Sequence, residues 1–174
     1  MHKDDQMTPK ERAAALARGE SVDRMPIAMF YGAPSHRLLG WDADAMFMDA
    51  RHHAELAKAG YLRYGMDGVT AKYGLHCMGI TYGATVLNPK DGSRAIINHP
   101  LKDITRDMGM LDLDRMTVTR DKEARRTFEA AQILLDELGD EVGCSFGSTG
   151  PFTNACALMG AENLMRAVDR KSAV

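Results

Sequence analysis

Ten side chains in this sequence have the types and positions that ligand binding needs. They fall into three groups, and each group follows a short apolar segment with the pattern of a buried strand. The loops that leave the carboxyl ends of parallel strands are where α/β proteins bind their ligands. The candidate binding residues are Tyr31, His36 and Arg37 after the first segment, Lys72, Tyr73 and His76 after the second, and Ser148, Thr149, Phe152 and Asn154 after the third.

The first two groups offer cationic and phenolic side chains. Arg37, together with His36, has donors suited to the carboxylate or phosphate groups of a substrate or cofactor, and the alternative is a solvated helix start. His76 and Cys77 are neighbours that invite a metal interpretation. Adjacent residues point to different sides of a strand or helix, however, so we expect no metal site and expect this group to line a pocket.

The third group surrounds a glycine-rich turn. Gly147 and Gly150 allow close approach to the backbone, and the amide of Asn154 can hydrogen-bond the edge of a flat heterocycle. The alternative is that Ser148 or Thr149 caps the following helix. No pair of carboxylates stands out as a general acid and base.

Composition indicates a globular protein with one substantial core. The 174 residues are 45% hydrophobic and 26% charged, and the net charge is −2. Because no basic block is longer than Arg125-Arg126, we expect no nucleic-acid partner. No apolar stretch approaches the ~20 residues of a membrane helix and no signal segment begins the chain, so we expect a cytoplasmic protein without a membrane partner. Thirteen methionines fit core filling better than a cofactor surface.

The elements that must position the candidates alternate between helices and strands. A capping box at Thr8-Pro9-Lys10-Glu11 predicts a helix to about Arg18. Periodicity and turn residues then predict strands at 24–30, 68–73 and 141–146, helices at 35–39, 49–64, 122–138 and 162–170, another helix after 147–151, and a hairpin of 85–87 with 94–97.

The buried faces of the two long helices also follow from helical spacing. We expect Ala54, Ala57, Tyr61 and Tyr64 to face the core from one helix, and Ala124, Phe128, Ala131, Leu134 and Leu135 from the other. Strands separated by helices imply a parallel sheet. The sequence therefore predicts one α/β unit over residues 1–174, in which residues 1–24 form a helical extension before the first strand.

Several motifs, taken in order, resemble the uroporphyrinogen decarboxylase superfamily. Residues 7–12 with 19–26 resemble its opening helix and G-x-x-x-D-R-x-P turn, and residues 65–69 resemble the entry to its second strand. Residues 83–92 with 99–103 resemble its hairpin and H-P-I-x-D turn, and residues 150–153 with 160–162 resemble its G-P-F-T…G-x-E segment. The resemblance covers nearly the whole chain.

This resemblance implies the N-terminal part of a (β/α)8 TIM barrel, with about three barrel strands, their helices and a β-hairpin insertion. A complete barrel typically needs ~250 residues. A half barrel leaves sheet edges and apolar helix faces exposed, so we expect either self-association or a missing C-terminal half. We expect the fragment to be inactive alone.

Departures from the decarboxylase pattern favour the methyltransferase branch of the superfamily. The arginine-rich loop of the decarboxylases corresponds to residues 30–37, which keep one cation, while Gly74 and Ala157 stand where they carry an Asp and a Tyr. The resemblance implies methyl transfer from a corrinoid (cobalamin) protein to a thiol or to tetrahydrofolate. Thiol-using members bind zinc through ligands expected beyond Val174, so we expect no cofactor to be bound by this half itself. Uroporphyrinogen decarboxylation and a non-catalytic, self-associating half barrel remain the alternatives.

Overall fold

The computed structural model describes residues 3–28, 33–89 and 94–169. Contacts divide the chain into two compact units: residues 1–72 with 126–147, which we call the sheet unit, and residues 73–125 with 148–174, which we call the hairpin unit. The single unit expected from the sequence stays a prediction.

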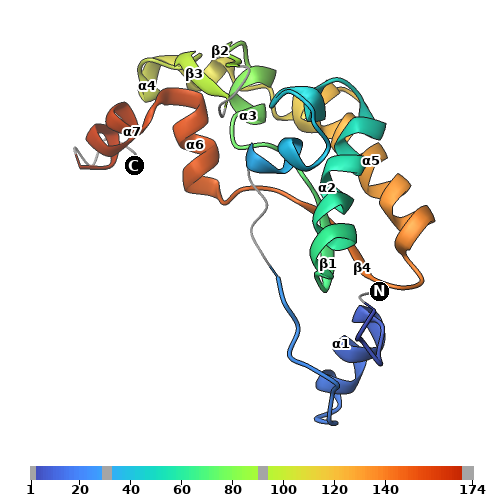
Figure 1. Ribbon diagram of the computed structural model, residues 1–174. Helices are drawn as coiled ribbons and strands as arrows, with labels where there is room; N and C mark the ends of the chain where they lie inside the picture. Colours follow the sequence, from blue (N-terminus) through green and yellow to red (C-terminus); the bar gives the residue numbers. More distant parts are fainter. Residues whose placement is uncertain (1–2, 29–32, 90–93, 170–174) are drawn as a thin grey trace. The chain divides into compact units, whose positions relative to one another are not determined.

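The sheet unit contains a two-stranded parallel sheet covered by helices (Figure 1). Strands β1 (Gly68–Lys72) and β4 (Gly143–Gly147) pair with Val69 opposite Cys144. Helices α2 (Ala50–Tyr64) and α5 (Lys122–Leu138), of which the part from Arg126 onward belongs to this unit, lie side by side. The core between helices and strands consists of Ala54, Tyr61, Val69, Ala71, Ala130, Leu134 and Val142.

Local signals set the ends of helix α2 as the sequence predicted. Asp49 is its N-cap and accepts a hydrogen bond from the backbone N–H of His52 at 2.8 Å. Gly65 ends the helix with φ of +63°, a left-handed conformation that glycine adopts without steric cost. Before α2, the short helix expected at 35–39 is the 3-10 helix η1 (Ala33–Leu38), followed by η2 (Ala45–Phe47).

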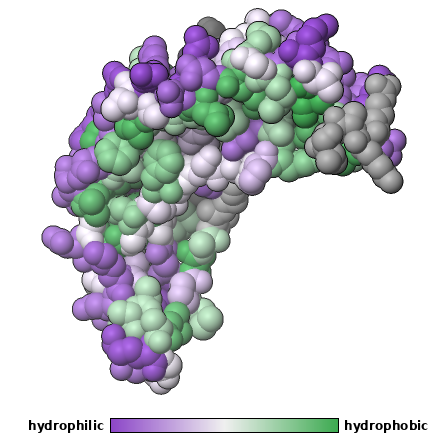
Figure 2. Space-filling view, turned by 180° about the vertical axis from the view of Figure 1, so that it is seen from behind, coloured by the Kyte–Doolittle hydropathy of each residue, from purple (hydrophilic) through white to green (hydrophobic). Residues whose placement is uncertain are grey.

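The predicted helix faces are partly wrong. Tyr64 is half exposed, and so are Phe128 and Leu135, at 50% and 51%. The predicted Ala124 and Leu134 of α5 are buried, but Thr127 and Ala130 are buried in place of Phe128 and Leu135, since small residues let a helix approach a sheet closely. Figure 2 shows one face of the molecule, on which apolar and polar side chains are interspersed at the surface.

The first predicted strand, residues 24–30, is also wrong in its described part. Residues 25–28 are in no strand, and residues 29–30 lie outside the described residues. Pro26 has no N–H to donate to a ladder, and Met25 is 72% exposed. Ile27 nevertheless meets the start of β1, since its carbonyl accepts a hydrogen bond from the backbone N–H of Asp67 at 2.9 Å. The described residues therefore hold two of the three expected parallel strands.

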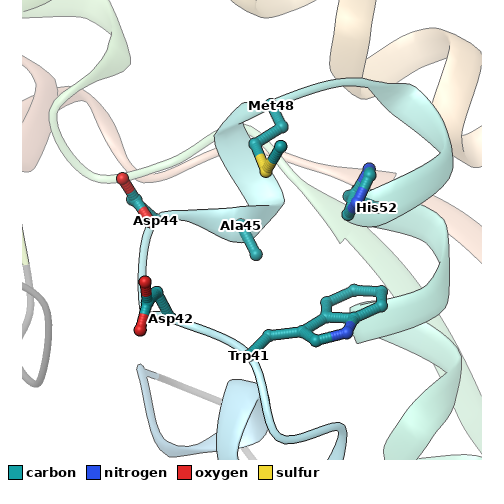
Figure 3. A pocket seen from close by; sticks show the side chains of 6 residues that line it. All are labelled: Trp41, Asp42, Asp44, Ala45, Met48 and His52. Atoms are coloured by element: carbon teal, nitrogen blue, oxygen red, sulfur yellow. The ribbon is translucent and has the colours of Figure 1, made fainter.

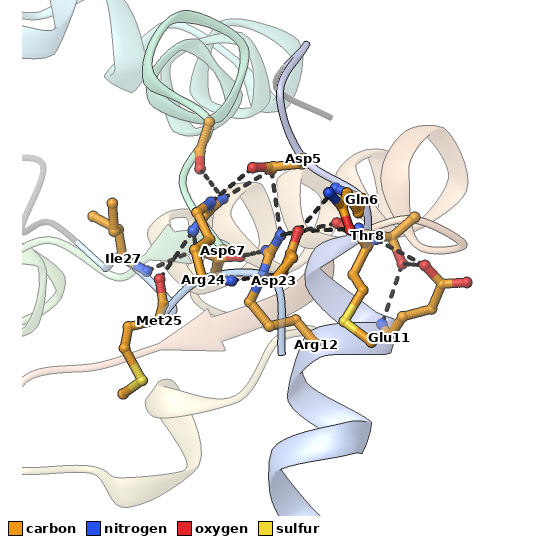
Figure 4. A network of polar contacts seen from close by, with 12 residues as sticks. Asp5, Gln6, Thr8, Glu11, Arg12, Asp23, Arg24, Met25, Ile27 and Asp67 are labelled. Carbon is orange, nitrogen blue, oxygen red and sulfur yellow. Dashed lines mark hydrogen bonds and ion pairs between the residues drawn. The ribbon is translucent and has the colours of Figure 1, made fainter. Parts of the chain in front are cut away.

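A network of charged side chains joins the N-terminal helix α1 (Pro9–Ala17) to the amino end of β1 (Figure 4). The Arg12 side chain is fully buried and donates to Asp23 at 2.7 and 2.8 Å and also to Asp67. Arg24 donates to Asp5 at 2.7 Å and to Asp67 at 2.6 Å. Helix α1 itself starts with the predicted capping box. The network therefore fixes the N-terminal extension to the amino end of the sheet.

The hairpin unit combines an antiparallel hairpin with short helices (Figure 1). Its strands, β2 (Thr85–Leu87) and β3 (Ala95–Asn98), pair as predicted, and part of the predicted turn, residues 90–93, lies outside the described residues. Leu101, Leu158, Met159 and Leu164 form its apolar core. The remaining elements are α3 (Cys77–Thr81), α4 (Ile104–Asp107), η3 (Met108–Met110), η4 (Leu113–Met116), α6 (Pro151–Met159) and α7 (Ala161–Asp169).

Two glycines allow close contacts around α6, one between α3 and α6 and the other between the end of α6 and His99. A Cβ atom on Gly79 would lie 2.6 Å from the carbonyl oxygen of Ala157, which is too close for any other residue without a shift. The same carbonyl contacts His99 Nδ1 at 3.0 Å, and Gly160, with φ of +80°, leaves room for the His99 ring. The H-P turn after β3 is thus anchored to the end of α6.

Candidate functional site

The carboxyl end of the sheet carries polar side chains on one face. Because side chains alternate along a strand, Val69 and Ala71 face the helices while Thr70 and Lys72 face the opposite side. The hydroxyl oxygens of Thr70 and Ser145 lie 2.9 Å apart across the two strands. The predicted candidate Lys72 therefore shares its face with a pair of hydroxyl groups.

Gly147 leaves space beside Lys72. It stands opposite Lys72 in the register, and a Cβ atom there would come within 3.0 Å of the Thr70 methyl carbon and 3.9 Å of Lys72 Cγ. A larger residue would crowd this face at the end of the strands. The sequence indicated Gly147 as a point of close approach, but it gave no sign of the Thr70–Ser145 pair, because that contact spans 75 residues.

The first candidate group has a different setting. His36 and Arg37 lie on η1, which packs on α2; His36 is 5% exposed, whereas Arg37 is exposed. The backbone carbonyl of His36 accepts the N–H of Trp41 at 3.0 Å, so the turn after η1 is closed. Tyr31 lies outside the described residues.

Tyr73 lies in a buried polar cluster of the hairpin unit. Its hydroxyl is 3.4 Å from Thr81 Oγ1 and donates to Asp121 Oδ2 at 3.5 Å, while Thr81 also donates to Asp121. Burial, more than any other factor, raises the pKa of Tyr73 well above its usual range, so the phenol stays protonated and acts as a donor. Asp121 in turn accepts the backbone N–H of Ala124 at 2.6 Å and caps α5.

The neighbours His76 and Cys77 have different surroundings. Cys77 is 1% exposed and its thiol donates to Glu123 Oε2 at 3.3 Å, whereas His76 is half-buried and precedes α3 without a capping side-chain bond. Within residues 3–28, 33–89 and 94–169, no group of three His, Cys, Asp or Glu side chains could hold a metal ion. Sequence reasoning missed Glu123, and the sequence shows Asp121 only as the residue that precedes the predicted helix 122–138, a position that favours a helix cap.

Two members of the third candidate group form hydrogen bonds with each other. Thr149 Oγ1 donates to Asn154 Oδ1 at 2.6 Å, and Asn154 Nδ2 donates to the carbonyl of Thr149 at 3.0 Å. Capping of α6 by Ser148 or Thr149 is wrong, because Gly150 is the N-cap and Pro151 begins the helix. Phe152 remains 57% exposed. In the part of the chain that the structure describes, no helix has the length and apolar character needed to cross a membrane.

Parallel strands joined through helices, with polar side chains at their carboxyl ends, are the mark of an α/β protein. The chain belongs to the uroporphyrinogen decarboxylase (URO-D) family, whose model matches residues 8–173. No curated protein matches the chain.

A solved structure of a methyltransferase from Methanosarcina mazei is similar to the chain, with a TM-score of 0.71 and 21% identity. The similarity covers 96% of this chain and 50% of that one, so the chain spans half the length of the structure it matches. The α/β fold expected from the sequence, the N-terminal part of a (β/α)8 barrel, is confirmed.

Proposed function

We propose that the chain is part of a methyltransferase that moves a methyl group from a methyl-corrinoid protein to a thiol or to tetrahydrofolate. The observation that supports this most directly is the likeness of nearly the whole chain to a methyltransferase structure. In the reaction, the acceptor's nucleophilic atom forms a bond to the methyl carbon while the carbon–cobalt bond breaks and its electron pair stays on the cobalt. The corrinoid is therefore a substrate carried by a partner.

Lys72 is the residue proposed to bind the acceptor. Its ammonium group can pair with an anionic part of the acceptor, a sulfonate or carboxylate, by charge-assisted hydrogen bonds. The hydroxyl groups of Thr70 and Ser145 lie on the same face and can complete the donor set, and Gly147 keeps the space beside them open. These groups orient the acceptor and supply no proton to the methyl transfer.

Zinc activation of a thiol would need ligands from outside the described residues, since these offer no group of three suitable side chains. We propose that such ligands, and the strands that complete the barrel, belong to a C-terminal half. Strands β1 and β4 pair only with each other among the described residues, so each has an edge to which a further strand can add.

The decarboxylase alternative finds less support in the structure. Ala157, which stands where the decarboxylases carry a Tyr, is 4% exposed, and its carbonyl is enclosed by Gly79 and His99. Because this position is buried, a phenol there would require the surrounding residues to shift. Gly74, where they carry an Asp, offers no carboxylate at the carboxyl end of β1.

The test is an assay of the natural full-length protein with methylcobalamin and either a thiol such as coenzyme M or tetrahydrofolate. Loss of the methylcobalamin absorbance with one acceptor supports the proposal. Lys72→Met should lower kcat/KM by roughly tenfold to a hundredfold, because a charge-assisted contact contributes about 1.5–3 kcal/mol. Lys102→Met is the matched control, because Lys102 is exposed and bonds Asn98. Turnover of uroporphyrinogen instead would reject the proposal.

A further inference from the structure

A shallow pocket in the sheet unit lies between η2 and the start of α2 (Figure 3). It has a volume of about 180 Å³, ample for a small organic group, since one water needs only roughly 10–15 Å³ of such space. Its lining residues are Trp41, Asp42, Asp44, Ala45, Met48 and His52. None of the polar side chains assigned above to methyl transfer belongs to it.

One wall of the pocket is aromatic. The ring centroids of Trp41 and His52 are 5.0 Å apart with planes tilted by 51°. The His52 ring is held in place because its Nδ1 lies 2.8 Å from a carboxylate oxygen of Asp49, the N-cap of α2. The hydrogen bond from the backbone N–H of His52, more than any other factor, lowers the pKa of Asp49 and keeps it ionised. The position of the aromatic wall is thus set by the helix cap.

The opposite side of the pocket carries two carboxylates. Figure 3 shows Asp42 and Asp44 across the hollow from the two rings, with Ala45 and Met48 between them. Both carboxylates are exposed, and neither has an ion-pair partner within the described ranges. No Lys or Arg lines the pocket.

The nearby cations of α2 are already engaged. Arg51 and Lys58 both form ion pairs with Glu137 of α5, and Lys58 Nζ lies 2.6 Å from Glu137 Oε2. These pairs bind α2 to α5, and among the described residues no Lys or Arg forms an ion pair with Asp42 or Asp44. A ligand that carries a positive charge can therefore pair with these two carboxylates.

The pocket therefore combines a π face, a polarizable thioether and two carboxylates that have no ion-pair partner among the described residues. An anion would be repelled by the carboxylates, and a neutral apolar ligand would leave them without a partner. A hard metal ion takes oxygen ligands and gains little from indole or thioether. We propose that this pocket binds an alkylated ammonium group of a small molecule, with its methyl groups against Trp41 and Met48 and its charge facing Asp42 and Asp44.

The chain reports on this pocket directly, because Trp41 is its only tryptophan. Choline is titrated into the protein while Trp41 fluorescence and the indole N–H signal in NMR are followed, at constant ionic strength. The matched neutral probe is 3,3-dimethylbutan-1-ol, which has the shape of choline without its charge. We expect choline to give a saturable change and the neutral probe to bind at least roughly tenfold more weakly. Equal binding of the two probes, or no saturation with choline, overturns the proposal.

Substitution of the carboxylates separates a specific site from general electrostatics. The double variant Asp42→Asn with Asp44→Asn should weaken choline binding by roughly tenfold, as expected for the loss of two exposed charge contacts. Asp114→Asn with Asp140→Asn is the control, because it changes net charge equally at exposed positions elsewhere. Far-UV circular dichroism checks folding. Equal affinity of the two double variants would reject the pocket as the site.

A last experiment distinguishes a free small molecule from a modified protein side chain as the carrier of the ammonium group. A trimethyllysine peptide is compared with choline under the same conditions. Tighter binding of choline supports a free small molecule. Tighter binding of the peptide overturns that part of the proposal and assigns the pocket to a modified protein side chain.

Discussion

Replacement of Arg12 by Met should destabilise the protein strongly. The guanidinium is fully buried, donates to Asp23 and Asp67, bonds the carbonyl of Met7 at 2.9 Å and lies 3.4 Å from Asp5. Methionine fills a similar space without charge or donors. The change leaves three carboxylates with Arg24 as their one remaining cation in the network.

The expected loss in the free energy of unfolding follows from the cost of leaving a buried charge without its partner. Removal of one partner from a buried ion pair typically costs about 3–5 kcal/mol. With a urea m-value of about 2 kcal/mol/M, the unfolding midpoint should fall by roughly 1.5–2.5 M. Arg12→Lys should lose less, since it keeps the charge but not the forked donor geometry.

The assay is urea unfolding followed by circular dichroism. Arg18→Met is the matched control on the same helix, because Arg18 pairs with Glu20 at the surface, where both side chains are more than half exposed. Surface pairs of this kind contribute little to stability. If Arg12→Met and Arg18→Met shift the midpoint equally, the network does not hold the N-terminal extension and the reasoning is refuted.

Acid should weaken the same network. The side-chain hydrogen bond from Arg12 lowers the pKa of Asp23 well below its usual range, and that from Arg24 lowers the pKa of Asp5. Each folded-state carboxyl therefore binds fewer protons than its unfolded counterpart, whose pKa is about 3.9. This stabilisation is fully present above about pH 5 and is lost as the pH falls through the lowered pKa values. Urea midpoints measured from pH 5 to pH 2 should fall more steeply for the natural protein than for Arg12→Met, and parallel curves would contradict this.

Two further substitutions test the hairpin unit by the same urea assay. Asp121→Ala removes the cap of α5 and the acceptor shared by two buried hydroxyls, so it should cost about 2 kcal/mol, whereas Asp114→Ala, at an exposed site, should change little. Gly79→Ala should lower the free energy of unfolding by about 1–3 kcal/mol, because its methyl group would meet the Ala157 carbonyl. Gly109→Ala is the control, because a methyl group there meets open space. Equal urea midpoints for the two aspartate variants, or for the two glycine variants, would contradict the packing described.

Features determined by neighbouring residues could be predicted from the sequence. The capping box at Thr8 and Glu11 marked the start of α1, and Asp49 and Gly65 marked both ends of α2. The hairpin followed in the same way from its turn residues. Such signals act within a few residues, so they do not depend on how the rest of the chain folds.

Features that depend on distant partners were not predictable. Residues 24–28 have the apolar composition of a strand, but a strand needs a ladder partner, and Arg24 is committed to the ion network instead. The buried face of α5 was correct at Ala124 and Leu134 but not at Phe128, because size favoured Phe128 while packing against the sheet selected Ala130.

The candidate site shows the same division. The position of Lys72 near the end of a strand was predictable from the apolar pattern of residues 68–73. The Thr70–Ser145 contact and the position of Glu123 beside Cys77 join residues 75 and 46 positions apart, and no local pattern encodes them.

Strand β1 connects two environments that differ in kind. Asp67, just before its first residue, belongs to the ion network, and Lys72, its last residue, belongs to the candidate site. The five residue steps from Asp67 to Lys72 span roughly 16 Å. Substitutions at the carboxyl end can therefore alter what is bound without loosening the anchor at the amino end. Such a strand gives evolution, or an engineer, a rigid base on which ligand preference can change in small steps.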